Sequence, residues 1–119
     1  MFVRQYRYAY GESIYELPAG KLEKGEEPLL AAKRELEEEA GIKAKELNLL
    51  YVVYPTPGYT NEKIYVYEAT EGEKVKAHLD EDEFLDVEYI ALEKVEEMLK
   101  NGEIKDAKTI IALQAYFLK

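Results

Sequence analysis

Three glutamates at a helical spacing are the residues of this chain best placed to do chemistry. Glu35, Glu38 and Glu39 stand at positions i, i+3 and i+4, so on a helix, which turns by about 100° per residue, they fall within roughly 100° of one face. Like charges crowded on one surface repel unless a positive charge lies among them. Mg²⁺ and Mn²⁺ prefer carboxylate oxygens and are commonly held together with substrate phosphates. The spacing therefore predicts a metal-assisted phosphate site.

The composition argues against a side-chain nucleophile. The chain has no cysteine, and Ser13 and His78 are its only serine and histidine. A Ser-His-Asp mechanism would need both residues, but His78 lies in a stretch rich in Lys and Glu that is typical of a surface strand or loop. Hydrolysis here would have to use an activated water molecule.

Length and charge narrow the class of protein further. We expect 119 residues to form one domain, over 1–119, and 47% hydrophobic with 34% charged residues indicates a soluble globular protein. No run approaches the ~20 apolar residues of a membrane span, and Arg4 and Arg7 stand where a signal peptide would be apolar. The net charge of −9 disfavours nucleic acid as a partner. We expect a cytoplasmic protein without a membrane partner.

The acidic residues lie in a predicted helix over 28–40. Pro28 suits its first turn, and Gly41 follows where a left-handed cap is expected. Between them, apolar residues recur at spacings of three and four beside the acidic wedge: Leu29, Ala32, Leu36 and Ala40. The helix is therefore expected to pack on one side and to present carboxylates on another.

The remaining elements predict a mixed sheet with helices on its faces. Alternating and apolar runs predict strands at 2–9, 13–17, 47–54, 62–69, 75–79 and 85–90, the first two as a hairpin and 47–54 as a buried strand. Two further helices are expected at 92–100 and 107–118, the first ended by Asn101-Gly102.

The segment from Gly20 to Ile42, GKLEKGEEPLLAAKRELEEEAGI, resembles the Nudix box of the Nudix hydrolases. That pattern runs Gly, five residues, Glu, seven residues, Arg-Glu, an aliphatic residue, any residue, Glu-Glu, any residue, Gly and an aliphatic residue. Every specified position is met, Glu26 and Arg34 included. The resemblance implies an α/β fold, the Nudix α/β/α sandwich with a mixed sheet.

The resemblance extends to the ADP-ribose pyrophosphatase branch of the family. Pro57 stands sixteen positions past Gly41, where that branch usually has proline. Further similar segments are VRQYR at 3–7, ELPAGK at 16–21, Gly58 with Glu62, and GEIKDA at 102–107 followed by IALQ at 111–114. The branch hydrolyses ADP-ribose, a small nucleoside diphosphate derivative, to AMP and ribose 5-phosphate.

By position, the resemblance implies that Glu35, Glu38 and Glu39 ligate Mg²⁺, or Mn²⁺, with the backbone carbonyl of Ala19 as a further ligand. Glu38 and Arg34 would also belong to the catalytic machinery, Arg34 by holding the carboxylates in place through charge-assisted hydrogen bonds.

The resemblance also implies substrate contacts and a catalytic base. Arg7 and Glu16 would contact ADP-ribose, and the loop bearing Pro57, Gly58 and Glu62 would close over it. In this branch the base comes from an acidic loop after the box, which corresponds to DEDE at 80–83. Here Glu83 is favoured and Glu81 is second.

Other functions stay open at this stage. The box fits equally a Nudix pyrophosphatase for another nucleotide sugar, a dinucleoside polyphosphate or a nucleoside triphosphate. A domain that senses ADP-ribose without cleaving it is a different class, but such domains typically lose box carboxylates or the flanking arginine, and all are present here.

The chain departs from the branch at its start. Proteins of the branch usually carry further strands before the VRQYR segment, whereas here Met1 stands two residues before it. Lacking those strands would leave a sheet edge or an apolar face uncovered. We therefore expect a homodimer, with the eleven tyrosines as interface material.

Overall fold

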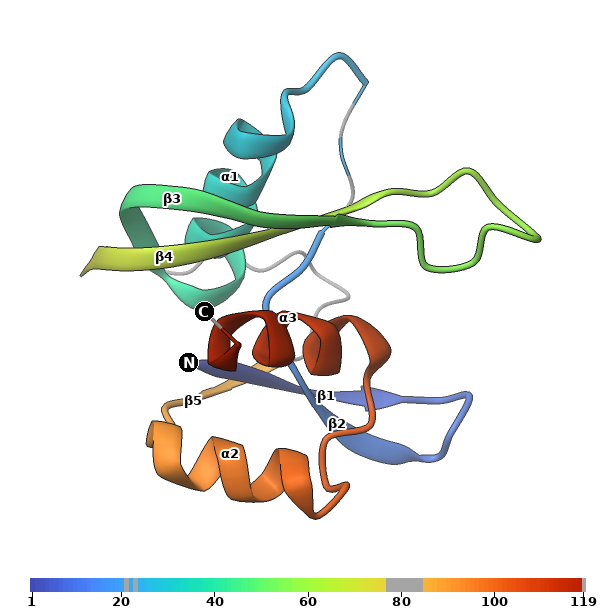
Figure 1. Ribbon diagram of the computed structural model, residues 1–119. Coiled ribbons are helices and arrows are strands. Elements are labelled where there is room, and N and C mark those ends of the chain that lie inside the picture. Colours follow the sequence, from blue (N-terminus) through green and yellow to red (C-terminus); the bar gives the residue numbers. More distant parts are fainter. Residues whose placement is uncertain (21, 23, 77–84, 119) are drawn as a thin grey trace.

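A computed structural model describes residues 1–20, 22, 24–76 and 85–118 of the chain. It has α/β architecture, as predicted, and within the described residues its elements follow in the order β1 (Phe2–Arg7), β2 (Glu12–Glu16), α1 (Pro28–Ala40), β3 (Ile42–Val53), β4 (Ile64–Lys74), β5 (Leu85–Glu88), α2 (Leu92–Lys100) and α3 (Ala107–Phe117). Figure 1 shows β3, β4 and α1 in one part of the molecule and the other elements in a second part.

The first sheet has the strand order β2-β1-β5, with both pairings antiparallel. The predicted hairpin is confirmed: Val3 pairs with Glu16, and the turn closes where Gly11 donates its backbone N–H to the Arg7 carbonyl at 3.0 Å. Gly11 has a φ of 65°, a left-handed conformation that glycine adopts without steric cost. The hairpin brings Arg7 and Glu16 onto neighbouring strands.

The second sheet consists of β3 and β4, paired antiparallel from Ile42 opposite Lys74 to Val53 opposite Ile64. The prediction of a single mixed sheet was wrong for the described residues, whose strands form two antiparallel sheets. A helical crossover joins parallel strands only when both strands enter one sheet. Here α1 instead connects β2 of the first sheet to β3 of the second.

Two strand boundaries also differ from the sequence prediction. β3 begins at Ile42, immediately after the helix cap, rather than at Leu47, and β4 continues to Lys74. Val75 and Lys76 of the predicted 75–79 strand lie outside any strand, and positions 77–79 fall outside the described residues. The extended pairing of β3 with β4 uses the residues that sequence patterns had left between elements.

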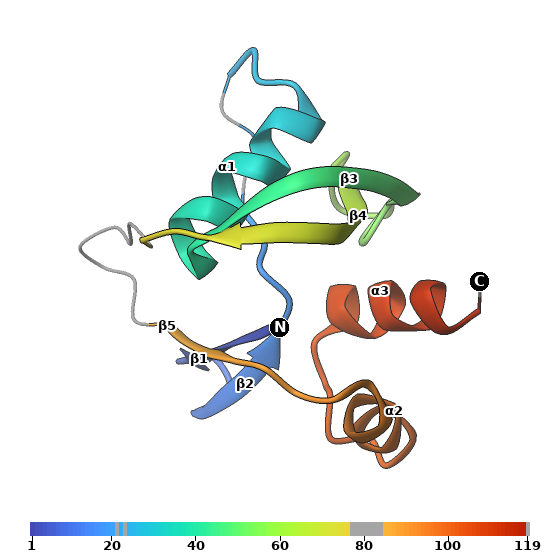
Figure 2. The same cartoon turned by 90° about the vertical axis from the view of Figure 1, so that its left-hand side faces the viewer.

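The hydrophobic core lies between the first sheet and the two C-terminal helices. Its buried members are Phe2, Val95, Met98, Ile104 and Leu113. Partly buried side chains from β2 and α3 pack against it, and the ring of Tyr15 meets that of Phe2 edge-on at 6.4 Å. Figure 2 shows α2 and α3 together beside this sheet. The core therefore fixes α3 against the strands that carry Arg7 and Glu16.

The turn after α2 orients α3. Gly102 has a φ of 73°, its N–H donates to the Leu99 carbonyl at 3.3 Å, and Glu103 N–H donates to the Met98 carbonyl at 3.0 Å. This pair of bonds is a Schellman motif, which satisfies the last carbonyls of a helix. The predicted stop at Asn101-Gly102 is confirmed.

The prediction that 47–54 forms a buried strand was wrong. Leu49, Tyr51, Val52 and Tyr54 are each 44–62% exposed. α1 packs against β3, and α3 also contacts β3 and β4, yet these side chains stay largely accessible to solvent. A continuous apolar run shows that a segment is hydrophobic. Whether its side chains are buried depends on which elements pack against the strand.

No helix among the described residues is both long and apolar enough to cross a membrane.

Candidate active site

Helix α1 forms where the sequence predicts it. Pro28 begins the helix, and Gly41 ends it with a φ of 65° while donating its N–H to the Glu37 carbonyl at 3.0 Å. The buried positions are Ala31 and Glu39, whereas the predicted apolar stripe, Leu36 included, is only half-buried. One of the three wedge carboxylates therefore points into the protein. We refer to Glu35, Glu38 and Glu39 as the acidic face of α1.

Arg34 connects three carboxylates. Its Nε and Nη2 donate to the two oxygens of Glu26 at 2.8 and 3.0 Å, and its Nη1 lies 2.9 Å from Glu35 Oε1 and 3.0 Å from Glu38 Oε2. The bidentate pair with Glu26 adds geometric specificity to the charge attraction. Arg34 thus ties the loop before α1 to the acidic face.

The loop after β2 lies directly against the acidic face. Ala19 N–H donates to Glu39 Oε2 at 3.3 Å, and the Glu39 side chain is buried, with the residue only 8% exposed. A Cβ atom added at Gly20 would overlap the carboxyl group of Glu35. A side chain at position 20 would therefore displace the Glu35 carboxyl group, and glycine allows the loop to approach that group closely. The structure brings Ala19 to the acidic face through its N–H.

The acidic face does not form a ready-made metal cage. Among the described residues, no three acidic or histidine side chains are arranged to hold a metal ion, because Arg34 lies between Glu35 and Glu38 while Glu39 faces Ala19. The donor set still fits a hard divalent cation. Mg²⁺ usually binds through one or two carboxylates plus substrate phosphates and water. Here three carboxylates gather around the single positive charge of Arg34, and the Glu39 carboxylate lies against the Ala19 N–H.

The predicted substrate residues Arg7 and Glu16 form a second cluster, with Lys108 of α3. Arg7 Nε and Nη2 donate to the two Glu16 oxygens at 2.7 and 2.8 Å, and Lys108 Nζ donates to Glu16 Oε1 at 2.9 Å. The Glu16 side chain is 5% exposed, whereas 44% of the Arg7 side chain is exposed. Glu16 is therefore enclosed by its two cations, and Arg7 reaches the surface.

These contacts shift all three pKa values. Burial works to raise the pKa of the Glu16 carboxyl, but the hydrogen bonds from Arg7 and Lys108 outweigh it and lower the pKa. The pKa of Arg7 is raised by its hydrogen bonds to Glu16. Burial works to lower the pKa of Lys108, and the hydrogen bonds to Glu16 and Asp106 raise it overall. The cluster is therefore charged at neutral pH.

Sequence reasoning missed Asp106, Lys108 and Thr109 as members of this cluster. Asp106 caps α3 by accepting from Thr109 N–H at 3.2 Å, accepts from Thr109 Oγ1 at 2.6 Å, and pairs with Lys108 Nζ at 2.9 Å. An aspartate preceding an amphipathic run signals a helix N-cap, which could have been found. No local pattern shows that position 108 meets a strand 92 residues earlier.

The predicted substrate loop lies elsewhere. Pro57, Gly58 and Glu62 belong to the exposed connection between β3 and β4, where Tyr59 and Thr60 donate to the Thr56 carbonyl at 3.0 Å. Figure 1 shows this connection projecting beyond the end of the two strands, away from α1. The fold does not bring it to the acidic face. The predicted bases Glu81 and Glu83 lie outside the described residues.

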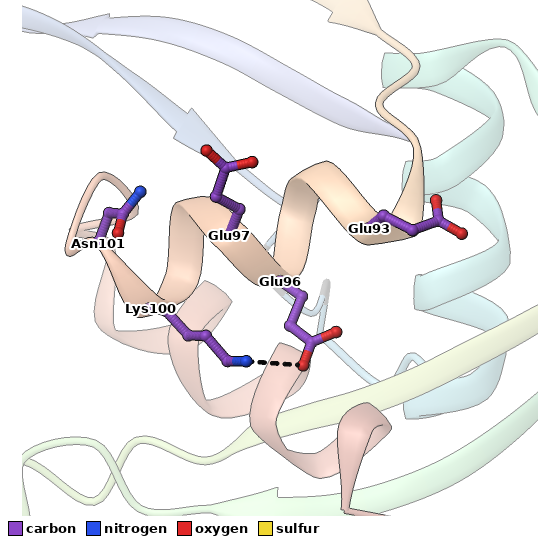
Figure 3. A pocket seen from close by; sticks show the side chains of 5 residues that line it. All are labelled: Glu93, Glu96, Glu97, Lys100 and Asn101. Carbon is purple, nitrogen blue, oxygen red and sulfur yellow. Dashed lines mark ion pairs between the residues drawn. The ribbon is translucent and has the colours of Figure 1, made fainter.

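A separate shallow pocket lies on α2 (Figure 3) and is lined by Glu93, Glu96, Glu97, Lys100 and Asn101. Its Lys100–Glu96 ion pair, at 3.2 Å, joins side chains that are at least half exposed. Such pairs contribute about 0.5 kcal/mol or less. All five residues belong to one helix and its end, so this pocket brings no distant groups together and is not the candidate site.

Comparison with known proteins identifies the family. The model of the NUDIX domain matches residues 1–113, so the chain belongs to the Nudix family. The chain is 44% identical to the ADP-ribose pyrophosphatase of Bacillus subtilis (strain 168), over all of this chain and 65% of that protein. It is 43% identical to the methanol dehydrogenase activator of Bacillus methanolicus, over 96% of this chain and 63% of that protein.

A solved structure shares the fold. An ADP compounds hydrolase superposes with a TM-score of 0.88 at 25% identity, over 98% of this chain and 63% of that one. The predicted Nudix fold is thereby confirmed. The chain spans less than two thirds of the length of these three relatives.

The Arg7–Glu16–Lys108 cluster predicts a pH-dependent contribution to stability. Replacing Glu16 by Gln should lower the free energy of unfolding at pH 7 by about 2 kcal/mol, because two cations lose a buried partner. Since the pKa of Glu16 is lowered in the folded protein, its stabilisation is complete above the unfolded-state pKa of about 4.3 and disappears as pH falls through the folded-state pKa. Urea unfolding from pH 7 to pH 3 measures the difference.

Glu12→Gln is the matched control for that experiment. Glu12 lies on the same strand but pairs with Lys105 at 3.6 Å on the surface, so its replacement should change the free energy of unfolding by less than about 0.5 kcal/mol. A difference between wild type and Glu16→Gln that is equal at pH 7 and pH 3 would contradict the assignment.

Proposed function

We propose that this protein hydrolyses the diphosphate bond of ADP-ribose, or of a closely related nucleoside diphosphate derivative, in a divalent-metal-dependent reaction. The observation that carries the proposal is the set of carboxylates braced by Arg34, with the backbone of Ala19 and Gly20 against it. Further support comes from two relatives named ADP-ribose pyrophosphatase, at 44% identity and, in Mycobacterium tuberculosis, at 38%.

The proposed reaction is substitution at phosphorus. A water oxygen forms a bond to one phosphorus of the diphosphate while the bond from that phosphorus to the bridging oxygen breaks, which yields AMP and ribose 5-phosphate. Mg²⁺, or Mn²⁺, bound at the acidic face would neutralise the diphosphate and lower the pKa of a water molecule. Glu35, Glu38 and Glu39 are the proposed ligands, with the Ala19 carbonyl as a further one.

The roles of the remaining residues follow from their charge and position. Arg34 orients Glu35 and Glu38, from which it lies 2.9 and 3.0 Å. Arg7 is paired with Glu16 on one side, and the rest of its side chain is exposed. It therefore supplies a fixed positive charge for an anionic substrate. We also propose that Pro57, Gly58 and Glu62 contact the substrate. Because their loop projects away from α1, an assembly larger than one chain would have to bring them to it.

A substrate panel with and without Mg²⁺ tests the proposed function. ADP-ribose should release AMP faster than a GDP-sugar, a dinucleoside polyphosphate or ATP, and only with the metal. Glu38→Gln should slow that release at least about tenfold, since metal-site substitutions commonly cost this much. The control Glu37→Gln removes a neighbouring charge outside the box pattern and should leave the rate within about twofold.

Two results of the panel would overturn the proposal. Faster cleavage of another compound would reassign the substrate class. Tight ADP-ribose binding without Mg²⁺-dependent turnover would instead indicate a sensing domain.

The proton of the attacking water requires a base, and we propose Glu83, with Glu81 second. General base catalysis typically contributes 10²- to 10⁴-fold, so Glu83→Gln should slow AMP release by about 10²-fold or more and Glu81→Gln by less. The rates are measured for each variant at saturating ADP-ribose and Mg²⁺. If neither replacement slows turnover by more than about tenfold, the acidic segment does not supply the base.

We also propose a homodimer in the cytoplasm. Leu49, Tyr51 and Val52 of β3 are exposed on the two faces of the second sheet and provide apolar area of the kind that interfaces cover. Sedimentation at micromolar concentration should give a species of twice 13.8 kDa, and Tyr51→Glu should shift it toward the monomer because a charge would enter the interface. A single species of 13.8 kDa for the wild type would contradict the dimer.

A further inference from the structure

The start of α3 contacts the loop that lies against the acidic face. The Leu17 N–H donates to Thr109 Oγ1 at 3.0 Å, although the two residues are 92 positions apart. Leu17 is the first residue after β2, which ends at Glu16 opposite Val3. The Thr109 hydroxyl therefore receives a backbone N–H at the point where the strand ladder stops.

Thr109 is itself fixed on every side. It is fully buried, with an exposed fraction of 0%. Its hydroxyl donates to Asp106 Oδ2 at 2.6 Å, and the same oxygen accepts from Thr109 N–H at 3.2 Å and from Lys108 Nζ at 2.9 Å. Because the Thr109 hydroxyl donates its proton to Asp106 Oδ2, it keeps one orientation. Its oxygen lone pairs then face the Leu17 N–H.

The chain from Leu17 to the acidic face is short and stiff. Pro18 locks its own φ near −65° and restricts Leu17 before it. Ala19 then donates to Glu39, and Gly20 lies directly against the Glu35 carboxyl group, which a side chain at position 20 would displace. A displacement at Leu17 would therefore be transmitted to both carboxylates. Figure 2 shows this segment running from the first sheet up to α1.

We propose that Thr109 is a positioning residue for the acidic face: its hydroxyl holds the Leu17 amide and thereby fixes Ala19 and Gly20 against Glu39 and Glu35. This inference rests on the proposed function, because it assigns the acidic face to a divalent cation. Thr109 is fully buried and is not one of the proposed metal ligands. It acts through the backbone, so replacing it should weaken metal binding before substrate is added.

The test is Mn²⁺ binding to the substrate-free protein, followed by the electron paramagnetic resonance signal of free Mn²⁺. Thr109→Val keeps the shape and removes the hydroxyl, and should weaken Mn²⁺ binding about tenfold, the scale on which outer residues of metal sites act. Thr109→Ser keeps the hydroxyl and should restore affinity to within about twofold. The matched control Thr70→Val, at an exposed position on β4, should bind like the wild type.

Stability is measured in parallel to separate positioning from folding. A Thr109→Val protein that unfolds at lower temperature but binds Mn²⁺ like the wild type overturns the inference. If Thr109→Val does not fold, Thr109→Ala removes the same hydroxyl without crowding. In the wild type, saturating Mg²⁺ should also slow hydrogen exchange of the Leu17 amide more than that of the Val95 amide, because coupling is reciprocal. Equal slowing at both amides overturns the inference without any variant.

Glu39→Gln distinguishes failure of this inference from failure of the proposed function. If Glu39→Gln binds Mn²⁺ as tightly as the wild type, the acidic face is not the metal site and the proposed function fails with it. If Glu39→Gln loses Mn²⁺ and Thr109→Val keeps it, the metal site stands and only the positioning role of Thr109 is wrong.

Discussion

The organisation of this molecule depends on the four residues from Leu17 to Gly20, which are held between two helices. Leu17 is bound by Thr109 of α3, and Ala19 is bound by Glu39 of α1. The segment also leaves the first sheet and enters the part that contains the second. Pro18 restricts the backbone in the middle of the segment, so the segment is a short, stiff connection rather than a flexible linker. The acidic face of α1 is thereby placed relative to the Arg7–Glu16–Lys108 cluster.

Two arginines with different partners perform different tasks in this arrangement. Arg34 pairs with three carboxylates from the loop and the helix, so it holds these negatively charged groups together. Arg7 pairs with one carboxylate that Lys108 also neutralises, so part of its guanidinium stays exposed and positively charged. A site for a dianionic diphosphate needs both conditions. It needs oxygen ligands for a cation at one side and a fixed positive charge for the substrate at another.

Charge also explains how an acidic protein could bind the anionic substrate proposed for it. The net charge of −9 repels polyanions at a distance, which argues against nucleic acid. Close to the acidic face, a bound divalent cation reverses the sign of the local field. The proposed preference for a small phosphorylated compound over a polymer would follow from the difference between the field at the site and the field of the whole surface.

The sequence alone determined α1 and its carboxylates, because both depend on local rules. Pro28 and Gly41 fix the ends of the helix, and the i, i+3 and i+4 spacing fixes which glutamates share a face. The β1–β2 hairpin and the stop of α2 at Gly102 are equally local. The box pattern then predicted the family.

Only the tertiary structure decided which of these groups meet and which are covered. The spacing could not tell that Glu39 points inward to Ala19, or that Lys108 and Thr109 reach back to Glu16 and Leu17. It also misjudged the apolar run of β3, whose side chains stay exposed although α1 packs against β3 and α3 contacts both strands of that sheet. Contacts between residues about ninety positions apart depend on how sheets and helices pack, and packing leaves no periodic signal in a single sequence.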